Sequence, residues 1–265
     1  SYALGVKRYG FKISAISRSQ ESIDYAIEKG MIDEGTTLID KDMIASADIV
    51  IFALYPETFK NWIKENQQNF KPHTLISDVT GVKSCVVYDI QEMLREDVEY
   101  IPAHPMAGKE VLGVKNADSN IFKNANYIIT PTSNNTKEAI DTCPFCLEAY
   151  VIYACKELGM LLGFKNIMEL SPEKHDEIIG FVSQLTHCIA VSLMTCNDEE
   201  NLEKYTGDSF RDLTRIARIN DLMWSELFID NKDVLIKQLD SFIDEFKRLK
   251  EMLKNDDVDV MRLMM

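Results

Sequence analysis

His104 is the residue whose type and surroundings first point to chemistry. It lies in the segment YIPAHPMAGKEVLGV (100–114), between a short apolar run and Pro105. A neutral imidazole has a pKa of about 6.5 when unperturbed, and it can accept a hydrogen bond from a hydroxyl group and then its proton. Pro105 lacks a backbone N–H, so we expect a strand to end there. A histidine at a strand end is more often structural, and its position alone leaves both interpretations open.

A second polar group, Ser17, Arg18 and Ser19, follows the segment FKISAIS (11–17). Dehydrogenases that use NAD normally carry an aspartate or glutamate at the end of the second strand of their nucleotide-binding domain. This carboxylate binds the adenine ribose. An arginine flanked by two hydroxyls instead supplies charge-assisted donors for a 2′-phosphate. These residues favour NADP, with NAD possible. A polar turn that binds no ligand is the alternative.

Basic side chains recur at helical spacing in FRDLTRIAR, as Arg211, Arg215 and Arg218. This spacing is typical of the basic face of an amphipathic helix.

Cys143 and Cys146 form a C-x-x-C pair, but neither a thioredoxin-like strand nor a second cysteine pair accompanies them. We therefore expect ordinary thiols there and no metal site.

Strands and helices alternate in the first part of the chain. Helices are expected at 20–30, 56–70 and 81–94, and strands at 11–17, 47–54, 73–79, 98–103, 125–131 and 165–170. The strands lack a polar face, which is typical of a parallel sheet covered by helices on both sides. Residues 1–170 are therefore predicted to form an α/β Rossmann-type nucleotide-binding domain. The predicted cofactor-binding residues follow its strands: Ser17, Arg18, Ser19, Leu54, Tyr55, Pro56 and Asp78.

The second part of the chain has a helical period almost throughout. Its first segment, SPEKHDEII, has serine at the N-cap, proline in the first turn and glutamate behind it, which is a strong helix start. Residues 171–265 are predicted to form a separate all-α domain.

The predicted sheet has no glycine-rich turn of the kind that usually follows its first strand. Ser1 already lies in what reads as the first helix, so residues 11–17 would form the second strand. Each backbone group left unpaired in a buried sheet costs about 1 to 3 kcal/mol. We expect a further strand and glycine loop before Ser1 in the natural chain.

Composition excludes several classes of partner. The chain has 43 acidic and 29 basic residues, a formal net charge of −14, and no long basic cluster, which argues against nucleic acid or an anionic membrane surface. The sequence contains no run of about 18 uninterrupted apolar residues, which a membrane-spanning helix would need. Six cysteines without a secretory signal are expected to be free thiols in a reducing, cytoplasmic compartment.

Several motifs together resemble the prephenate and arogenate dehydrogenase family. They are SDVTGVK (77–83), HPMAGKEVLGV (104–114), ANYIITP (125–131), SPEKHD with SQLTH, and GDSFRDLTRIA (207–217), and they span the chain in order. The resemblance implies a glycine loop before Ser1, a helical domain that forms a homodimer, and a small-molecule substrate. The implied activity is NAD(P)-dependent oxidative decarboxylation of prephenate to 4-hydroxyphenylpyruvate in tyrosine synthesis.

The resemblance also implies roles for single residues. His104 matches the catalytic histidine, and Arg215 matches the arginine that binds the side-chain carboxylate of the substrate. Glu110 matches an acid that pairs with this arginine, and His187 matches a histidine that contacts the substrate side chain. His175 is a family feature too, and we interpret it as structural.

Two features bear on the substrate. Arogenate has an ammonium group where prephenate has a ketone, and a histidine donor at His187 suits the ketone, which favours prephenate. Many family members carry a substrate-holding serine where this chain has Gly81, whereas Lys109 replaces a threonine or another small residue. We hypothesise that Lys109 or the Thr80 hydroxyl supplies the missing contact.

Two alternatives stay open at this point. A dehydrogenase of the β-hydroxyacid type would use a lysine in its helical domain as acid and base, and no lysine here stands in such a motif. A catalytically impaired NADP-binding or sensing homologue is the other alternative, for which Gly81 gives some ground.

Overall fold

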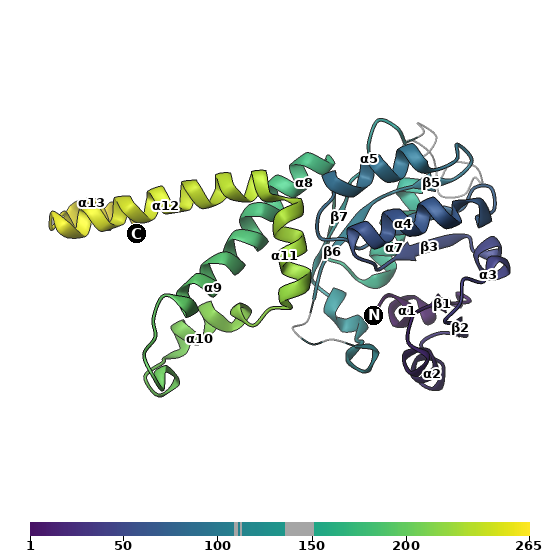
Figure 1. The fold of residues 1–265 in the computed structure, drawn as a ribbon, viewed down its shortest axis with the longest axis horizontal. Helices are drawn as coiled ribbons and strands as arrows, with labels where there is room; N and C mark the ends of the chain where they lie inside the picture. The colour runs from purple at the N-terminus through teal and green to yellow at the C-terminus, as the bar shows by residue number, and fades with distance from the viewer. Residues whose placement is uncertain (109–110, 112, 136–150) are drawn as a thin grey trace. The chain divides into compact units, whose positions relative to one another are not determined.

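The computed structural model describes residues 1–108, 111, 113–135 and 151–265 (Figure 1). It divides into two compact units, Ser1–His175 and Asp176–Met265. The residues singled out above at positions 109, 110, 143 and 146 lie outside the described part, so the hypotheses about Lys109 and Glu110 stay predictions.

The first unit contains three groups of paired strands. The first is β1 (Ser14–Ile16) parallel to β2 (Glu34–Thr36), and the second is β3 (Ile49–Phe52), β4 (Leu75–Asp78) and β5 (Glu99–Tyr100), all parallel. In the third, β7 (Asn126–Ile129) lies between β6 (Ala103–Met106), to which it is antiparallel, and β8 (Asn166–Glu169), to which it is parallel.

Helices cover both faces of the β3–β4–β5 group, as expected for a Rossmann-type domain (Figure 1). Phe52 and Ile76 point to the face where α4 (Pro56–Asn66) and α5 (Ser84–Met93) pack, and Phe59 and Val86 bury their side chains there. Leu75 points to the opposite face, into a second cluster with side chains of α7 (Val151–Leu162) and α1 (Tyr2–Lys7). The remaining helices of this unit are α2 (Gln20–Glu28), α3 (Lys41–Ser46) and short 3₁₀ turns at Gln67–Asn69, Val114–Asn116 and Ser119–Phe122.

The segment around His104 departs from the prediction in two ways. The expected strand at 98–103 is divided at Pro102 into β5 and β6, and β6 is antiparallel to its partner, so a wholly parallel sheet was wrong. The strand was also expected to stop at Pro105, yet β6 continues to Met106. Among the strands that the structure describes, β6 pairs only with β7, so Pro105 can lie in it without leaving a ladder hydrogen bond unmade.

The second unit is helical throughout, which confirms the predicted all-α domain. Helix α8 (Pro172–Ile179) begins in the first unit, and a π-helical turn, η4 (Gly180–Leu185), joins it to α9 (Thr186–Thr195). The helices that follow are η5 (Leu202–Lys204), α10 (Asp208–Thr214), η6 (Arg215–Ala217), α11 (Asp221–Asp230), α12 (Lys232–Lys254) and α13 (Val258–Met264). By length and composition alone, the helical segment Pro172–Thr195 is long and apolar enough to cross a membrane. An 18-residue stretch within it has a mean hydropathy of 1.6, and 28% of that stretch is buried.

Candidate active site

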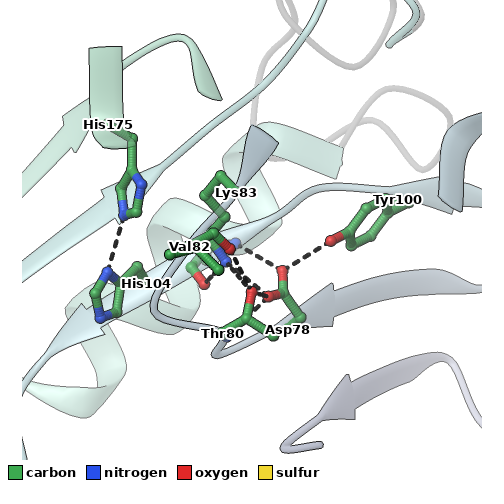
Figure 2. A network of polar contacts seen from close by, with 8 residues as sticks. Asp78, Thr80, Val82, Lys83, Tyr100, His104 and His175 are labelled. Carbon is green, nitrogen blue, oxygen red and sulfur yellow. Dashed lines mark hydrogen bonds and ion pairs between the residues drawn. The ribbon is translucent and has the colours of Figure 1, made fainter. Parts of the chain in front are cut away.

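A buried ion pair lies where β4 ends and α5 begins (Figure 2). Asp78 is the last residue of β4 and Lys83 is the N-cap residue of α5; both side chains are 0% exposed, and the Lys83 Nζ lies 2.6 Å from Asp78 Oδ2. Two charges removed from water in this way are stable only when they are paired and their remaining hydrogen-bonding capacity is used. Residues that meet this need surround the pair.

The Asp78 carboxylate accepts several further hydrogen bonds. The Thr80 backbone N–H donates to Oδ2 at 2.8 Å, and the Thr80 hydroxyl also contacts this oxygen. The Tyr100 hydroxyl donates to Oδ1 at 3.0 Å. Burial raises the pKa of Tyr100 well above its ordinary value, and the neighbouring Asp78 charge raises it further, so Tyr100 stays a neutral donor.

The ion pair holds the backbone of Ala103 from both sides. The Ala103 N–H donates to Asp78 Oδ1 at 3.3 Å, and the Lys83 ammonium donates to the Ala103 carbonyl oxygen at 2.6 Å. The side chains of β4 and α5 thereby tie the first residue of β6 to the end of the parallel group. The next residue in β6 is His104, so this network sets the position of the imidazole.

His104 is partly exposed, and within the described part of the chain it makes one hydrogen bond to another side chain. Its Nδ1 lies 2.9 Å from Nε2 of His175, which is on α8 and is 0% exposed (Figure 2). Desolvation lowers the pKa of His104 well below its ordinary value, and the charge of Lys83 lowers it further. The imidazole is therefore neutral at physiological pH, as a proton acceptor must be.

The contact between His175 and His104 was not predicted from the sequence. His175 was taken as structural, whereas the structure puts it in direct contact with the candidate catalytic residue, 71 positions away in the chain. The signal that was available is the SPEKHD motif in the family resemblance. Lys83 was not singled out either, because a lysine at a helix start is ordinarily solvated.

Among the predicted cofactor-binding residues, Asp78 and Pro56 are buried, and the others lie on or near exposed turns. Ser17 follows β1, Arg18 is exposed, and the Ser19 hydroxyl caps α2 by accepting from the Ser22 N–H at 3.2 Å. Leu54 and Tyr55 are exposed just before Pro56, the first residue of α4. These turns follow the carboxyl ends of the parallel strands β1 and β3, where α/β domains bind nucleotides.

Asp78 and Thr80 are both buried in this structure. Both were predicted to touch a ligand, but Asp78 is fully buried and Thr80 is nearly so, with its hydroxyl against Asp78 and the Val82 carbonyl oxygen. The physical reason is the buried Lys83, which requires a carboxylate and its supporting donors at this point. Asp78 supports the backbone beside His104, Thr80 supports Asp78, and their contacts with a ligand stay predictions.

His187 and Arg215 belong to the second unit. His187 lies on α9 and stacks on Trp224, with ring centroids 3.7 Å apart, and its Nδ1 is 2.8 Å from the Ser183 carbonyl oxygen. A carbonyl oxygen only accepts, so Nδ1 carries the proton. The N–H at His187 Nδ1 therefore donates to the backbone of the π-helical turn, and the expected contact of His187 with the substrate ketone stays a prediction. Arg215 is exposed at the start of η6.

Comparisons with known proteins agree with this arrangement. A family model described as prephenate dehydrogenase, nucleotide-binding domain, matches residues 2–150, and one described as prephenate dehydrogenase, dimerization domain, matches residues 171–265. Prephenate dehydrogenase of Bacillus subtilis is 28% identical over 98% of this chain and 68% of its own length. Prephenate dehydrogenase of Lactococcus lactis is 29% identical over 91% of this chain and 64% of its own length.

A solved structure shows the same relationship. Prephenate dehydrogenase from A. aeolicus, in complex with hydroxyphenyl propionate and NAD+, superposes with a TM-score of 0.83 at 30% identity, over 96% of this chain and 86% of its own. The chain spans about two thirds of the two curated relatives and most of this solved one. The two family matches cover both units, and His104 lies in the nucleotide-binding part beside the end of β4. The chain belongs to the prephenate dehydrogenase family.

Proposed function

We propose that this chain catalyses the oxidative decarboxylation of prephenate to 4-hydroxyphenylpyruvate in tyrosine synthesis. The observation that carries the proposal is the neutral, partly exposed imidazole of His104, anchored through Ala103 beside the end of β4. In this reaction the C4 hydroxyl of the substrate loses its proton, C4 loses a hydride, and the C1 carboxylate leaves as carbon dioxide while the ring becomes aromatic. The ring oxygen then regains a proton, which gives the phenol of 4-hydroxyphenylpyruvate. A bound nicotinamide ring supplies the hydride acceptor.

His104 is the proposed proton acceptor. Its Nδ1 is occupied by His175, and among the described residues no protein group bonds Nε2, so Nε2 is the atom that can receive the hydroxyl proton. The depressed pKa keeps this nitrogen unprotonated at neutral pH. General base catalysis of this kind contributes about 10²- to 10⁴-fold to a rate.

The experiment that tests the function mixes a preparation of this chain, including any upstream segment of the natural protein, with prephenate or arogenate and with NAD or NADP. Reduced cofactor is followed by absorbance and 4-hydroxyphenylpyruvate by chromatography. The proposal predicts turnover of prephenate with release of carbon dioxide. Turnover of arogenate alone would move the assignment to an arogenate dehydrogenase of the same family, and no turnover with any pair would support a nucleotide-binding homologue that is catalytically impaired.

We further propose NADP as the preferred cofactor, because Arg18 is exposed between Ser17 and Ser19 after β1. The two hydroxyls and the guanidinium suit a 2′-phosphate, and no carboxylate stands among the three residues to repel it.

Replacing Arg18 with alanine should raise the KM for NADP by roughly 10- to 100-fold, as expected for loss of a charge-assisted hydrogen bond. The KM for NAD should stay within about twofold, since NAD lacks the 2′-phosphate. Steady-state kinetics with both cofactors measure this, and Arg248→Ala on the exposed face of α12 is the matched control. Equal changes for NAD and NADP would exclude a contact to the 2′-phosphate.

Arg215 is proposed to bind a substrate carboxylate. Arg215→Ala should raise the KM for prephenate by roughly 10- to 100-fold, and Arg215→Lys should recover only part of the loss because an ammonium cannot form the two-pronged contact. The control is Arg211→Ala, one helical turn earlier, where the exposed guanidinium pairs with Asp208. If both alanine variants had the same KM as the unmodified protein, Arg215 would be only part of a solvated helix face.

A homodimer in the cytoplasm is the proposed assembly. Large apolar side chains are exposed along α12, namely Ile236, Ile243, Phe246 and Leu253, and Phe181 and Val182 are exposed in the π-helical turn of the apolar segment 172–195. Exposed apolar surface on this scale is typical of a protein interface. Burial against a second copy would account for this segment without a membrane, in keeping with the family description of residues 171–265 as a dimerization domain.

A further inference from the structure

We infer that His175 is a positioning residue that holds the proton of His104 on Nδ1 and thereby leaves Nε2 of His104 as the base. This inference rests on the proposed function and deepens it. The juxtaposition that carries it is the contact of 2.9 Å between His104 Nδ1 and His175 Nε2.

The direction of this hydrogen bond follows from the chemistry of two imidazoles. Two ring nitrogens at this distance share one proton, so one ring donates and the other accepts. If His175 donated, a neutral His104 would carry its own proton on Nε2 and could not accept another there. Only donation from His104 Nδ1 to His175 Nε2 leaves a lone pair on His104 Nε2, which is the nitrogen without a partner among the described residues.

Both rings are attached to anchored backbone, so the contact is held in place. His175 is 0% exposed, and its backbone N–H donates to the Ser171 carbonyl oxygen at 2.9 Å. The Ser171 hydroxyl caps the same helix start by accepting from the Lys174 N–H at 3.2 Å, and Tyr88 on α5 bonds the Glu173 carboxylate. On the other side, Lys83 and Asp78 hold Ala103, the residue before His104.

The same hydrogen bond supports the proton transfer itself. When the substrate hydroxyl loses its proton to His104 Nε2, the ring becomes an imidazolium, and its Nδ1–H donation to His175 becomes charge-assisted and stronger. Lys83, which is paired with Asp78, acts in the opposite direction by disfavouring a positive ring. His104 can therefore accept the proton in the transition state and release it afterwards to solvent, in the manner of an imidazole oriented by a second group.

The test begins with the unmodified protein labelled with ¹⁵N-histidine. The sequence has four histidines, so the ring signals can be assigned by replacing them one at a time. Two-bond ¹H–¹⁵N correlation spectra near neutral pH report which ring nitrogen carries the proton. The inference predicts a proton on Nδ1 and a bare Nε2 for His104, and an Nε2–H tautomer of His104 would overturn it.

Kinetics of two substitutions provide the second arm. His175→Leu removes the acceptor and should lower kcat at least about tenfold, with the KM for prephenate within about twofold and with loss of the fixed Nδ1–H tautomer. His175→Gln, whose amide oxygen can reach a similar position, should restore most of kcat and the tautomer. An unchanged kcat in a folded His175→Leu protein would overturn the inference.

A matched control comes from His73, an exposed histidine with a backbone φ of 64°. Asparagine tolerates this conformation, and His73→Asn should leave kcat and the His104 signals unchanged. If the unmodified protein shows the predicted tautomer but does not turn over prephenate, the proposed function fails while the direction of the hydrogen bond is upheld. The two failures are thus distinguishable.

Discussion

Replacing His104 with glutamine is expected to lower kcat for prephenate by about 10²- to 10⁴-fold. The amide cannot accept a proton at neutral pH, whereas the imidazole of His104 is neutral and ready to do so. The KM for prephenate and the dissociation constant for the cofactor should change little, because the imidazole acts in the transfer of the C4 hydroxyl proton and not in binding. Stopped-flow or steady-state measurements of reduced cofactor formation give the rate.

The His104 substitution has a clear structural control. The side chain is partly exposed and its backbone is held through Ala103, so His104→Gln should unfold at a temperature close to that of the unmodified protein. Circular dichroism melting curves check this. A folded His104→Gln protein with an unchanged kcat would show that another group takes the proton.

Breaking the buried ion pair is expected to have the largest effect on stability. Lys83→Met leaves the Asp78 carboxylate buried without its counter-charge, which should lower the free energy of unfolding by about 3 to 5 kcal/mol. Denaturant titrations followed by circular dichroism measure the change. The double substitution Asp78→Leu with Lys83→Met removes both charges and should recover part of this loss, since an apolar pair of similar volume is often tolerated.

An exposed ion pair provides the comparison for Lys83. Lys115 and Glu21 lie 2.9 Å apart with both side chains largely in solvent, so Lys115→Met should leave the denaturation midpoint nearly unchanged. If Lys83→Met were as stable as Lys115→Met, the Asp78–Lys83 pair would not be the anchor of the site. Folded Lys83→Met protein that remains should also show a lower kcat, because Ala103 loses one of its two tethers.

Local sequence signals were sufficient for most helices and strands of the nucleotide-binding part. Helix α2 begins after the N-cap residue Ser19, and α4 begins at Pro56, both of which are signals within a few residues of the helix start. Strand β2 and helix α3 were not predicted; β2 is only three residues long and lacks a clear apolar pattern. The all-helical second part followed from its uniform period.

The direction of β6 and the surroundings of His104 could not be read from local patterns. Whether β6 pairs with β4 or with β7 depends on residues more than 20 positions away in the chain, and Pro105 is tolerated only because β6 lies at the edge of its group. His175 and Lys83 look like ordinary polar residues at helix starts. Their importance comes from burial and from contacts with His104 and Ala103, which only the folded structure brings together.

The central claim is that His104 works as a neutral base, and the pH dependence of kcat/KM for prephenate tests it most directly. Desolvation and the Asp78-paired Lys83 lower the His104 pKa, so the acid limb of the profile should lie below the ordinary histidine value of about 6.5. At pH values between the lowered pKa of His104 and about 6.5, the imidazole is protonated in the unfolded chain but not in the folded protein. The free energy of unfolding therefore decreases as the pH falls through this range. An acid limb below about pH 6.5 that disappears in the residual activity of His104→Gln is the predicted result. A limb at or above about pH 6.5, or one that His104→Gln leaves in place, would contradict the account.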